Sequence, residues 1–176
     1  SFIDIVSLRC GWWCEEFRGA GFGHDDGRDN GAGTGTTMDI DHLIFDAGDV
    51  VLQSGRTFPA MKIAYKTWGT LNADRSNVIV YPTSFSAQHH DTQWLIREGG
   101  ILDPTRHFVI IPNLFGNGLS SSPSNAKPPF DGVRWPNFTA ADNVRVQQRF
   151  LREVFGIERV ALACGWSMGG IQAYHW

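Results

Sequence analysis

The chain has 176 residues, of which 42% are hydrophobic and 19% charged, and its formal net charge is -3. This composition is typical of a globular protein with a sizeable core and excludes disordered and fibrous classes. The slightly acidic balance argues against nucleic acid or an anionic membrane as a partner. No stretch reaches the roughly 18 consecutive apolar residues of a membrane-spanning helix. We therefore expect a cytoplasmic protein that acts on small-molecule substrates.

The three cysteines, Cys10, Cys14 and Cys164, form neither an even disulfide framework nor a paired C-x-x-C zinc pattern. Cys10 and Cys14 would need ligands from elsewhere to hold a metal. We predict reduced thiols, no metal site and no bound cofactor.

Residues 1–37 differ in texture from the rest of the chain. The segment 19–35 mixes glycine with scattered charges and has no apolar period of a helix or strand. We expect 1–37 to be a disordered extension, with Met38 as the natural start, and 38–176 to form the domain. The alternative is that 1–37 is a flexible natural tail.

From residue 43 onward the pattern alternates between strands and helices. Segments 43–52 and 58–68 are β-rich and predict an antiparallel opening pair. The later expected elements are buried strands at 77–81, 107–112 and 159–164, a short helix at 91–98, a long loop at 113–137, and a helix that Thr139 caps and Gly156 ends. This order predicts an α/β fold with a mostly parallel sheet, an antiparallel opening pair and flanking helices.

The motif that carries chemistry follows the last predicted strand and reads Gly165-Trp166-Ser167-Met168-Gly169. A G-x-S-x-G sequence between a strand and a helix is the nucleophile elbow of α/β-hydrolase folds. The serine there has a strained backbone, and Gly165 and Gly169 leave room for the neighbouring chain. A tight turn that only needed small residues would not require serine at its centre. We predict that Ser167 is the catalytic nucleophile.

Two backbone amides are candidates for holding the oxyanion of an acyl-transfer intermediate. The amide of Met168 lies at the N-terminus of the helix after the serine, where the helix dipole favours negative charge. The second donor in this fold comes from the loop after an earlier strand, and the amide of Ser84 has that place. Trp166 adjoins the serine and is a candidate wall of the acyl pocket.

A serine nucleophile also needs a histidine and an acid, which in this fold follow it in the chain. His175 is the one histidine after Ser167, and we expect it to lie too far along the helix to act as the base. The upstream run His89-His90-Asp91 could supply a metal ligand or a base, but we interpret it as a polar loop. We expect the chain to end before the acid and the histidine appear, and we predict no triad-dependent turnover from these residues alone.

Several segments from Ile63 to Trp176 carry motifs in a fixed order. They read A-Y-K-T-W-G-T-L-N from Ala64, F-V-I-I-P-N-L-F-G from Phe108, D-N-V-R-V-Q from Asp142, G-I-E-R from Gly156 and S-M-G-G-I-Q-A from Ser167. In these motifs the chain resembles the homoserine O-acetyltransferase family of α/β-hydrolase-fold enzymes, whose opening strand reads A-Y-E-T-x-G-x-L-N and whose elbow reads S-M-G-G-M-Q-A.

The resemblance implies ping-pong acyl transfer from acetyl-coenzyme A, or succinyl-coenzyme A in some members, to the hydroxyl of homoserine in methionine biosynthesis. It implies that Ser167 is acylated, that the Ser84 and Met168 amides hold the oxyanion, and that the intact protein is a homodimer. The family has H-A-L-T-G where this chain has P-T-S-F-S from Pro82, and a glycine where it has Trp166. These departures predict a changed acyl pocket or acceptor.

Two alternatives to the acyltransferase remain open. In an esterase or amidase of the same fold, water would replace the acceptor alcohol at the acyl-serine. In a non-catalytic remnant of the fold, Ser167 would have no partner groups at all. The identity of the group that reaches the acyl-serine separates the first two hypotheses.

Overall fold

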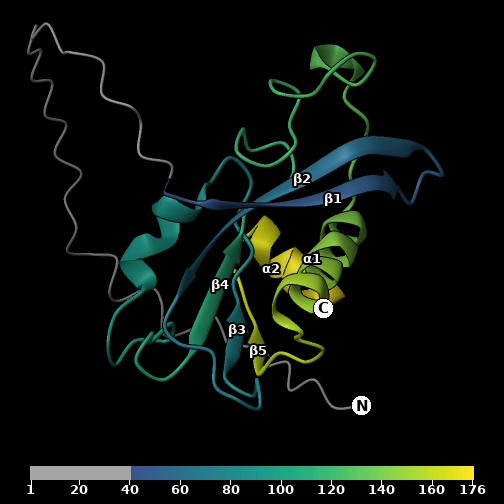
Figure 1. Ribbon diagram of the computed structural model, residues 1–176. Helices are drawn as coiled ribbons and strands as arrows, with labels where there is room; N and C mark the ends of the chain where they lie inside the picture. Colours follow the sequence, from purple (N-terminus) through teal and green to yellow (C-terminus); the bar gives the residue numbers. More distant parts are fainter. Residues whose placement is uncertain (1–40) are drawn as a thin grey trace, which may run out of the picture. The chain divides into compact units, whose positions relative to one another are not determined.

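The computed structural model describes residues 41–176, and the expectation of a disordered extension at 1–37 lies outside the described residues. The described part forms a five-stranded sheet with helices packed against it (Figure 1). The strands are β1 (Leu43–Val51), β2 (Thr57–Trp68), β3 (Val78–Val80), β4 (Phe108–Pro112) and β5 (Leu162–Ala163), and the helices are η2 (His89–Leu95), η3 (Gly132–Arg134), α1 (Ala140–Phe155) and α2 (Met168–His175).

The strand order across the sheet is β1-β2-β4-β3-β5. Strand β2 pairs antiparallel with both β1 and β4, whereas β3 pairs parallel with both β4 and β5. The predicted antiparallel opening pair is therefore confirmed, and so are the parallel strands, which together form a mixed sheet. Because β3 and β5 are parallel neighbours, the loops that follow them leave the sheet at the same edge.

Successive residues of the central strands face opposite sides of the sheet, and each side has its own apolar core. Helix α1 covers one face through Val146, Phe150 and Leu151, which are almost completely buried. The other face is smaller and consists of Ile79, Tyr81, Leu102, Val109 and Ile111, with partly buried side chains of η2 packed against it. The two layers hold the strands rigidly between them.

Helix α1 has the ends that its sequence predicts. The Thr139 hydroxyl accepts a hydrogen bond from the Asp142 amide, and the Asp142 carboxylate accepts one from the Thr139 amide, which is a capping box. At the other end Gly156 adopts the left-handed conformation, with φ 63°, that a side chain would disfavour. The chain turns at Gly156 and continues into β5 and the predicted elbow.

Within residues 41–176 no helix is both long and apolar enough to cross a membrane.

Candidate active site

The predicted elbow lies where β5 ends and α2 begins. Ser167 has φ 52° and ψ -121°, outside the regions that ordinary L-residues occupy, and Met168 is the first residue of α2. Strained backbone of this kind persists only where the surroundings over-determine it, and it concentrates at functional sites. The Ser167 side chain is exposed rather than packed into the sheet. The turn therefore presents the hydroxyl to solvent.

The two motif glycines are required by close backbone packing. A Cβ at Gly165 would lie 2.5 Å from the Gly169 carbonyl carbon, and a Cβ at Gly169 would lie 2.3 Å from the Pro82 carbonyl oxygen. Both distances are far below any normal carbon contact, and the atoms that would be struck belong to the backbone. Gly165 and Gly169 thus let the elbow close on itself and lie directly against the loop that follows β3.

That loop places Ser84 beside the elbow. The Ser84 hydroxyl donates a hydrogen bond of 2.7 Å to the carbonyl of Trp166, the residue before Ser167. The preceding Thr83 is fixed by two bonds, because its amide donates to the Pro112 carbonyl (3.2 Å) and its hydroxyl accepts from the Leu114 amide (2.9 Å). Among the described residues no group accepts a hydrogen bond from the Ser84 amide.

The Met168 amide belongs to the first turn of α2, where N–H groups have no acceptor within the helix. The positive end of the helix dipole adds to its preference for a negatively charged ligand. Met168 directly follows Ser167, and the Ser84 side chain binds the residue before it, so both amides belong to segments that meet at the elbow. Trp166 also adjoins this point, and its side chain is 58% exposed.

Two buried glutamines that sequence reasoning missed lie directly beneath the elbow. Gln172 of α2 and Gln147 of α1 are both 0% exposed. The Gln147 side-chain amide donates to Gln172 Oε1 (2.7 Å), and Gln172 Nε2 donates to the Thr83 carbonyl (3.2 Å). Gln172 occupies a position of the S-M-G-G-I-Q-A motif, which was the one available signal, but nothing in a single sequence shows that it is buried.

His175 does not serve the nucleophile. It is exposed and is the last residue of α2, eight positions beyond Ser167, which corresponds to about 12 Å along a helix axis. Within the described residues the Ser167 hydroxyl makes no hydrogen bond to a histidine. The prediction that His175 lies too far from the serine agrees with this geometry.

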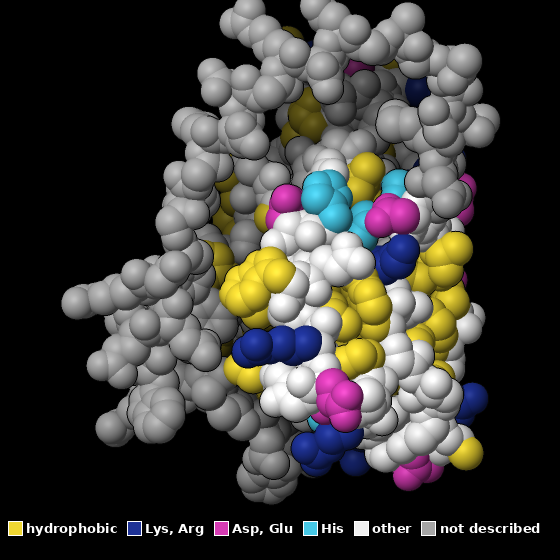
Figure 2. All heavy atoms as spheres, turned by 90° about the vertical axis from the view of Figure 1, so that its left-hand side faces the viewer, with side chains coloured by type: hydrophobic (Ala, Val, Ile, Leu, Met, Phe, Trp, Pro, Cys, Tyr) yellow, Lys and Arg dark blue, Asp and Glu magenta, His cyan; other side chains and the backbone are white. Residues whose placement is uncertain are grey.

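The run His89-His90-Asp91 forms the start of η2. Asp91 closes a capping box, because its carboxylate accepts from the Gln88 amide at 2.7 Å. His90 is exposed, while His89 is 1% exposed and donates from Nε2 to Asp41 at 3.0 Å. Figure 2 shows this face of the molecule, with histidine side chains lying beside acidic ones. The run is therefore part of a short helix and not the polar loop that the sequence predicted, and His89 is a buried anchor.

The ligand atoms of Asp41, His42 and His89 lie within 4.8 Å of one another, which raises the question of a metal site. The hydrogen bonds of the Asn113 side chain argue against a metal at His89. Asn113 Oδ1 accepts from the His89 backbone amide (3.0 Å), so Asn113 Nδ2 must donate to His89 Nδ1 (3.2 Å). The proton of the neutral ring therefore sits on Nε2, which cannot bind a metal while it donates to Asp41.

The pKa values of His89 and Asp41 follow from their surroundings. Burial lowers the pKa of His89, and this effect exceeds the opposite influence of the Asp41 hydrogen bond and charge. Partial burial opposes the charge of Asp41, but its hydrogen bond with His89 and the nearby charge of Lys66 outweigh it and lower the pKa of Asp41. The pair is thus a neutral imidazole donating to a carboxylate.

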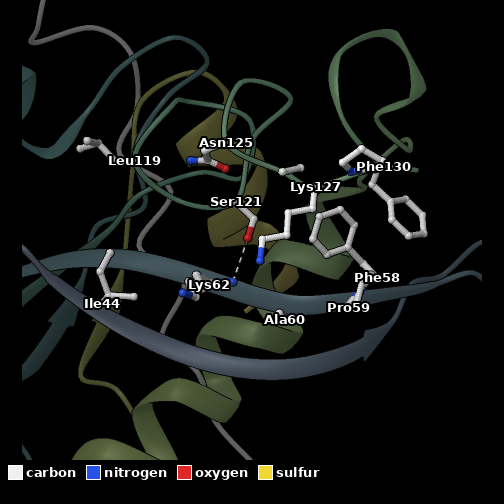
Figure 3. A pocket seen from close by; sticks show the side chains of 12 residues that line it. Ile44, Phe58, Pro59, Ala60, Lys62, Leu119, Ser121, Asn125, Lys127 and Phe130 are labelled. Carbon is white, nitrogen blue, oxygen red and sulfur yellow. Dashed lines mark hydrogen bonds between the residues drawn. The ribbon is translucent and has the colours of Figure 1, made fainter.

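A separate cavity of about 510 Å³ lies between the β1–β2 pair and the long loop after β4 (Figure 3). Phe58 and Phe130 form an apolar part of its wall, and Lys62 and Lys127 lie at its side (Figure 3). None of the elbow residues lines it, so it is not the site of the serine chemistry.

Comparisons with known proteins agree with this fold. A family model described as α/β hydrolase fold matches residues 94–176. The chain is 40% identical over 134 residues to an ethyl acetate hydrolase of Pseudomonas veronii, covering 76% of this chain and 38% of that protein. It is 37% identical over 132 residues to a homoserine O-acetyltransferase of Chlorobaculum parvum, covering 71% and 37%.

Among solved structures, an acetylester hydrolase from Corynebacterium glutamicum matches with a TM-score of 0.74 and 39% identity, over 77% of this chain and 39% of that one. The chain thus spans less than two fifths of the length of these relatives. Members of the matched family are enzymes, both esterases and acyltransferases. Homoserine O-acetyltransferases are among the relatives, which confirms the predicted resemblance, and the chain has the α/β-hydrolase fold.

Proposed function

We propose that Ser167 accepts an acetyl group from an ester and passes it to water. The observation that carries this proposal is the backbone of Ser167, whose φ of 52° holds an exposed hydroxyl on a turn that two glycines make possible. Such strain has no benefit for a loop that only connects a strand to a helix. It is useful where a nucleophile must project from a rigid sheet.

The proposed reaction has two steps. The Ser167 oxygen attacks the ester carbonyl carbon while a general base takes the hydroxyl proton, and the alcohol then leaves with a proton. Water next attacks the acetyl-serine, which releases acetate and restores the hydroxyl. In each step the negative charge on the former carbonyl oxygen is held by the amides of Met168 and Ser84. The base belongs to the sequence after the nucleophile in this fold.

The acetyl group is supported by the relatives. The names of the hydrolases from Pseudomonas veronii and Corynebacterium glutamicum and of the transferase from Chlorobaculum parvum all refer to an acetyl group or acetate. The proposed first half-reaction is therefore the same whichever acceptor follows. We place water first because a hydrolase is 40% identical to this chain, and because the loop and Trp166 depart from the transferase pattern.

A second candidate acceptor is the hydroxyl of homoserine, with acetyl-coenzyme A as the donor. The motifs around Ala64, Phe108 and Ser167 support it, as does the 37% identity to a homoserine O-acetyltransferase. In both candidates the substrates are small molecules, and neither reaction needs a metal or a bound cofactor.

The two candidates are separated by following the acetyl group in the full-length protein. The protein is mixed with p-nitrophenyl acetate or with acetyl-coenzyme A, and acetylation of Ser167 is read by mass spectrometry with and without homoserine. Discharge at the same rate with and without homoserine supports the hydrolase, and discharge that requires homoserine supports the transferase. Acetylation or turnover that persists in Ser167→Ala would contradict both.

A further inference from the structure

We infer that Gln172 is a positioning residue for the oxyanion site, because its side chain fixes the orientation of the peptide group that carries the Ser84 amide. This inference rests on the proposed function. Gln172 does not touch the reacting atoms. It acts from the buried side of the loop after β3, through the carbonyl of Thr83.

The argument begins with the peptide between Thr83 and Ser84. Gln172 Nε2 donates to the Thr83 carbonyl at 3.2 Å and to the Met168 carbonyl at 3.4 Å. In a trans peptide the C=O and the N–H of one group point in opposite directions. The bond to Gln172 therefore directs the Thr83 carbonyl into the core and turns the Ser84 amide away from it.

The Thr83 amide, the Thr83 hydroxyl and the Ser84 hydroxyl are already hydrogen-bonded, so the orientation of the peptide between the two residues is what remains to be fixed. The Thr83 amide donates to the Pro112 carbonyl, and the Thr83 hydroxyl accepts from the Leu114 amide. The Ser84 hydroxyl donates to the Trp166 carbonyl. Rotation of the peptide would break the bond to Gln172 and leave one N–H of its buried side-chain amide without an acceptor, which is costly.

The Gln172 side chain itself is held by α1. Its Oε1 accepts from Gln147 Nε2 at 2.7 Å, and Gln147 Oε1 accepts from the indole of Trp176 at 3.1 Å. This chain of bonds decides which end of the Gln172 amide faces Thr83, since its oxygen is already turned toward Gln147. Gln172 therefore presents a donor, and only a donor, to the Thr83 carbonyl.

The test compares Gln172→Leu with Asn143→Leu in the full-length protein. Asn143 is a matched control: it is 3% exposed, lies on α1, and uses its side-chain oxygen to hold the Phe115 amide of the loop after β4. Both changes remove a buried amide that ties a helix to a loop, so we expect similar losses in melting temperature. Loss of a single oxyanion donor costs about a hundredfold to a thousandfold in kcat, and misplacing one should cost about tenfold to a hundredfold.

We expect Gln172→Leu to lower kcat for p-nitrophenyl acetate by about tenfold to a hundredfold with KM changed less than about threefold, because the oxyanion forms only in the transition state. Asn143→Leu should change kcat by less than about twofold. Equal losses of kcat in the two variants would overturn the inference. A milder variant, Gln172→Glu, keeps one donor when its buried carboxyl is protonated, and should lose less activity than Gln172→Leu.

A crystal structure of Gln172→Leu, or of Gln172→Glu where the leucine variant does not fold, tests the orientation of the peptide directly and does not depend on an activity assay. A rotated Thr83–Ser84 peptide supports the inference, and an unchanged peptide overturns it. If the unaltered protein shows no Ser167-dependent turnover, the proposed function fails, while the orientation of this peptide is still decided by the structure.

Discussion

Replacing Ser167 by glycine should stabilise the protein while removing the proposed nucleophile. The side chain is exposed, and its residue has φ 52° and ψ -121°. A non-glycine residue in such a region stores about 1–3 kcal/mol of strain, which glycine releases. Glycine also gives the unfolded chain more freedom, at a cost of about 0.4–1 kcal/mol. The net expectation is a gain of about 1 kcal/mol in the free energy of unfolding.

The assay is urea or thermal unfolding of Ser167→Gly beside Ser167→Ala. For a chain of this size a gain of about 1 kcal/mol raises the melting temperature by roughly 2–4 °C. Ser167→Ala keeps the Cβ and therefore the strain, so its stability should stay within about 0.5 kcal/mol of the unaltered protein. If the glycine variant is no more stable than the alanine variant, the backbone of Ser167 is not strained and the argument for a built nucleophile fails.

Three further perturbations test other parts of the structure. Gly169→Ala places a Cβ 2.3 Å from the Pro82 carbonyl oxygen and should cost about 1–3 kcal/mol in chemical denaturation; a neutral effect would contradict the close packing. Because burial makes the pKa of His89 lower in the folded than in the unfolded state, its contribution to stability is full above about pH 6.5 and declines as the pH falls below that value. Unfolding measured from pH 7 to pH 5 should show this decline, and His89→Gln should flatten it. Asp142→Ala removes a buried carboxylate that accepts from backbone amides of two segments, and should lower the free energy of unfolding by at least about 2 kcal/mol.

The fold could be predicted where its signals are local. The capping box at Thr139 and the left-handed Gly156 define α1 as the sequence indicates, because both act within a few residues. The helix expected at 91–98 is instead η2, His89–Leu95, since its first turn is capped by Gln88, a residue that is not among the usual N-caps. The strand expected at 159–164 has only Leu162–Ala163 in ladder geometry.

Contacts between distant segments could not be predicted from the sequence. The antiparallel pairing of Tyr65 with Pro112 joins the opening pair to the parallel strands, and apolar runs do not reveal which neighbour a strand will choose. The candidate site likewise has a local part that the sequence predicts and a long-range part that it does not. The elbow is a turn of five residues and its glycines could be read directly, whereas Gln172 and Thr83 are 89 positions apart and meet only through the packing of α2 on the loop.

The closest approach between the elbow and the loop after β3 is made by backbone atoms. The Pro82 carbonyl lies against Gly169, and Gly169 lies against Gly165, with no side chain between them. The Trp166 side chain next to this contact is 58% exposed. Because the close approach of Gly165 and Gly169 uses no side-chain atom of Trp166, where the family pattern has a glycine, we expect side chains of different size at this position to leave the backbone of Ser167 in place.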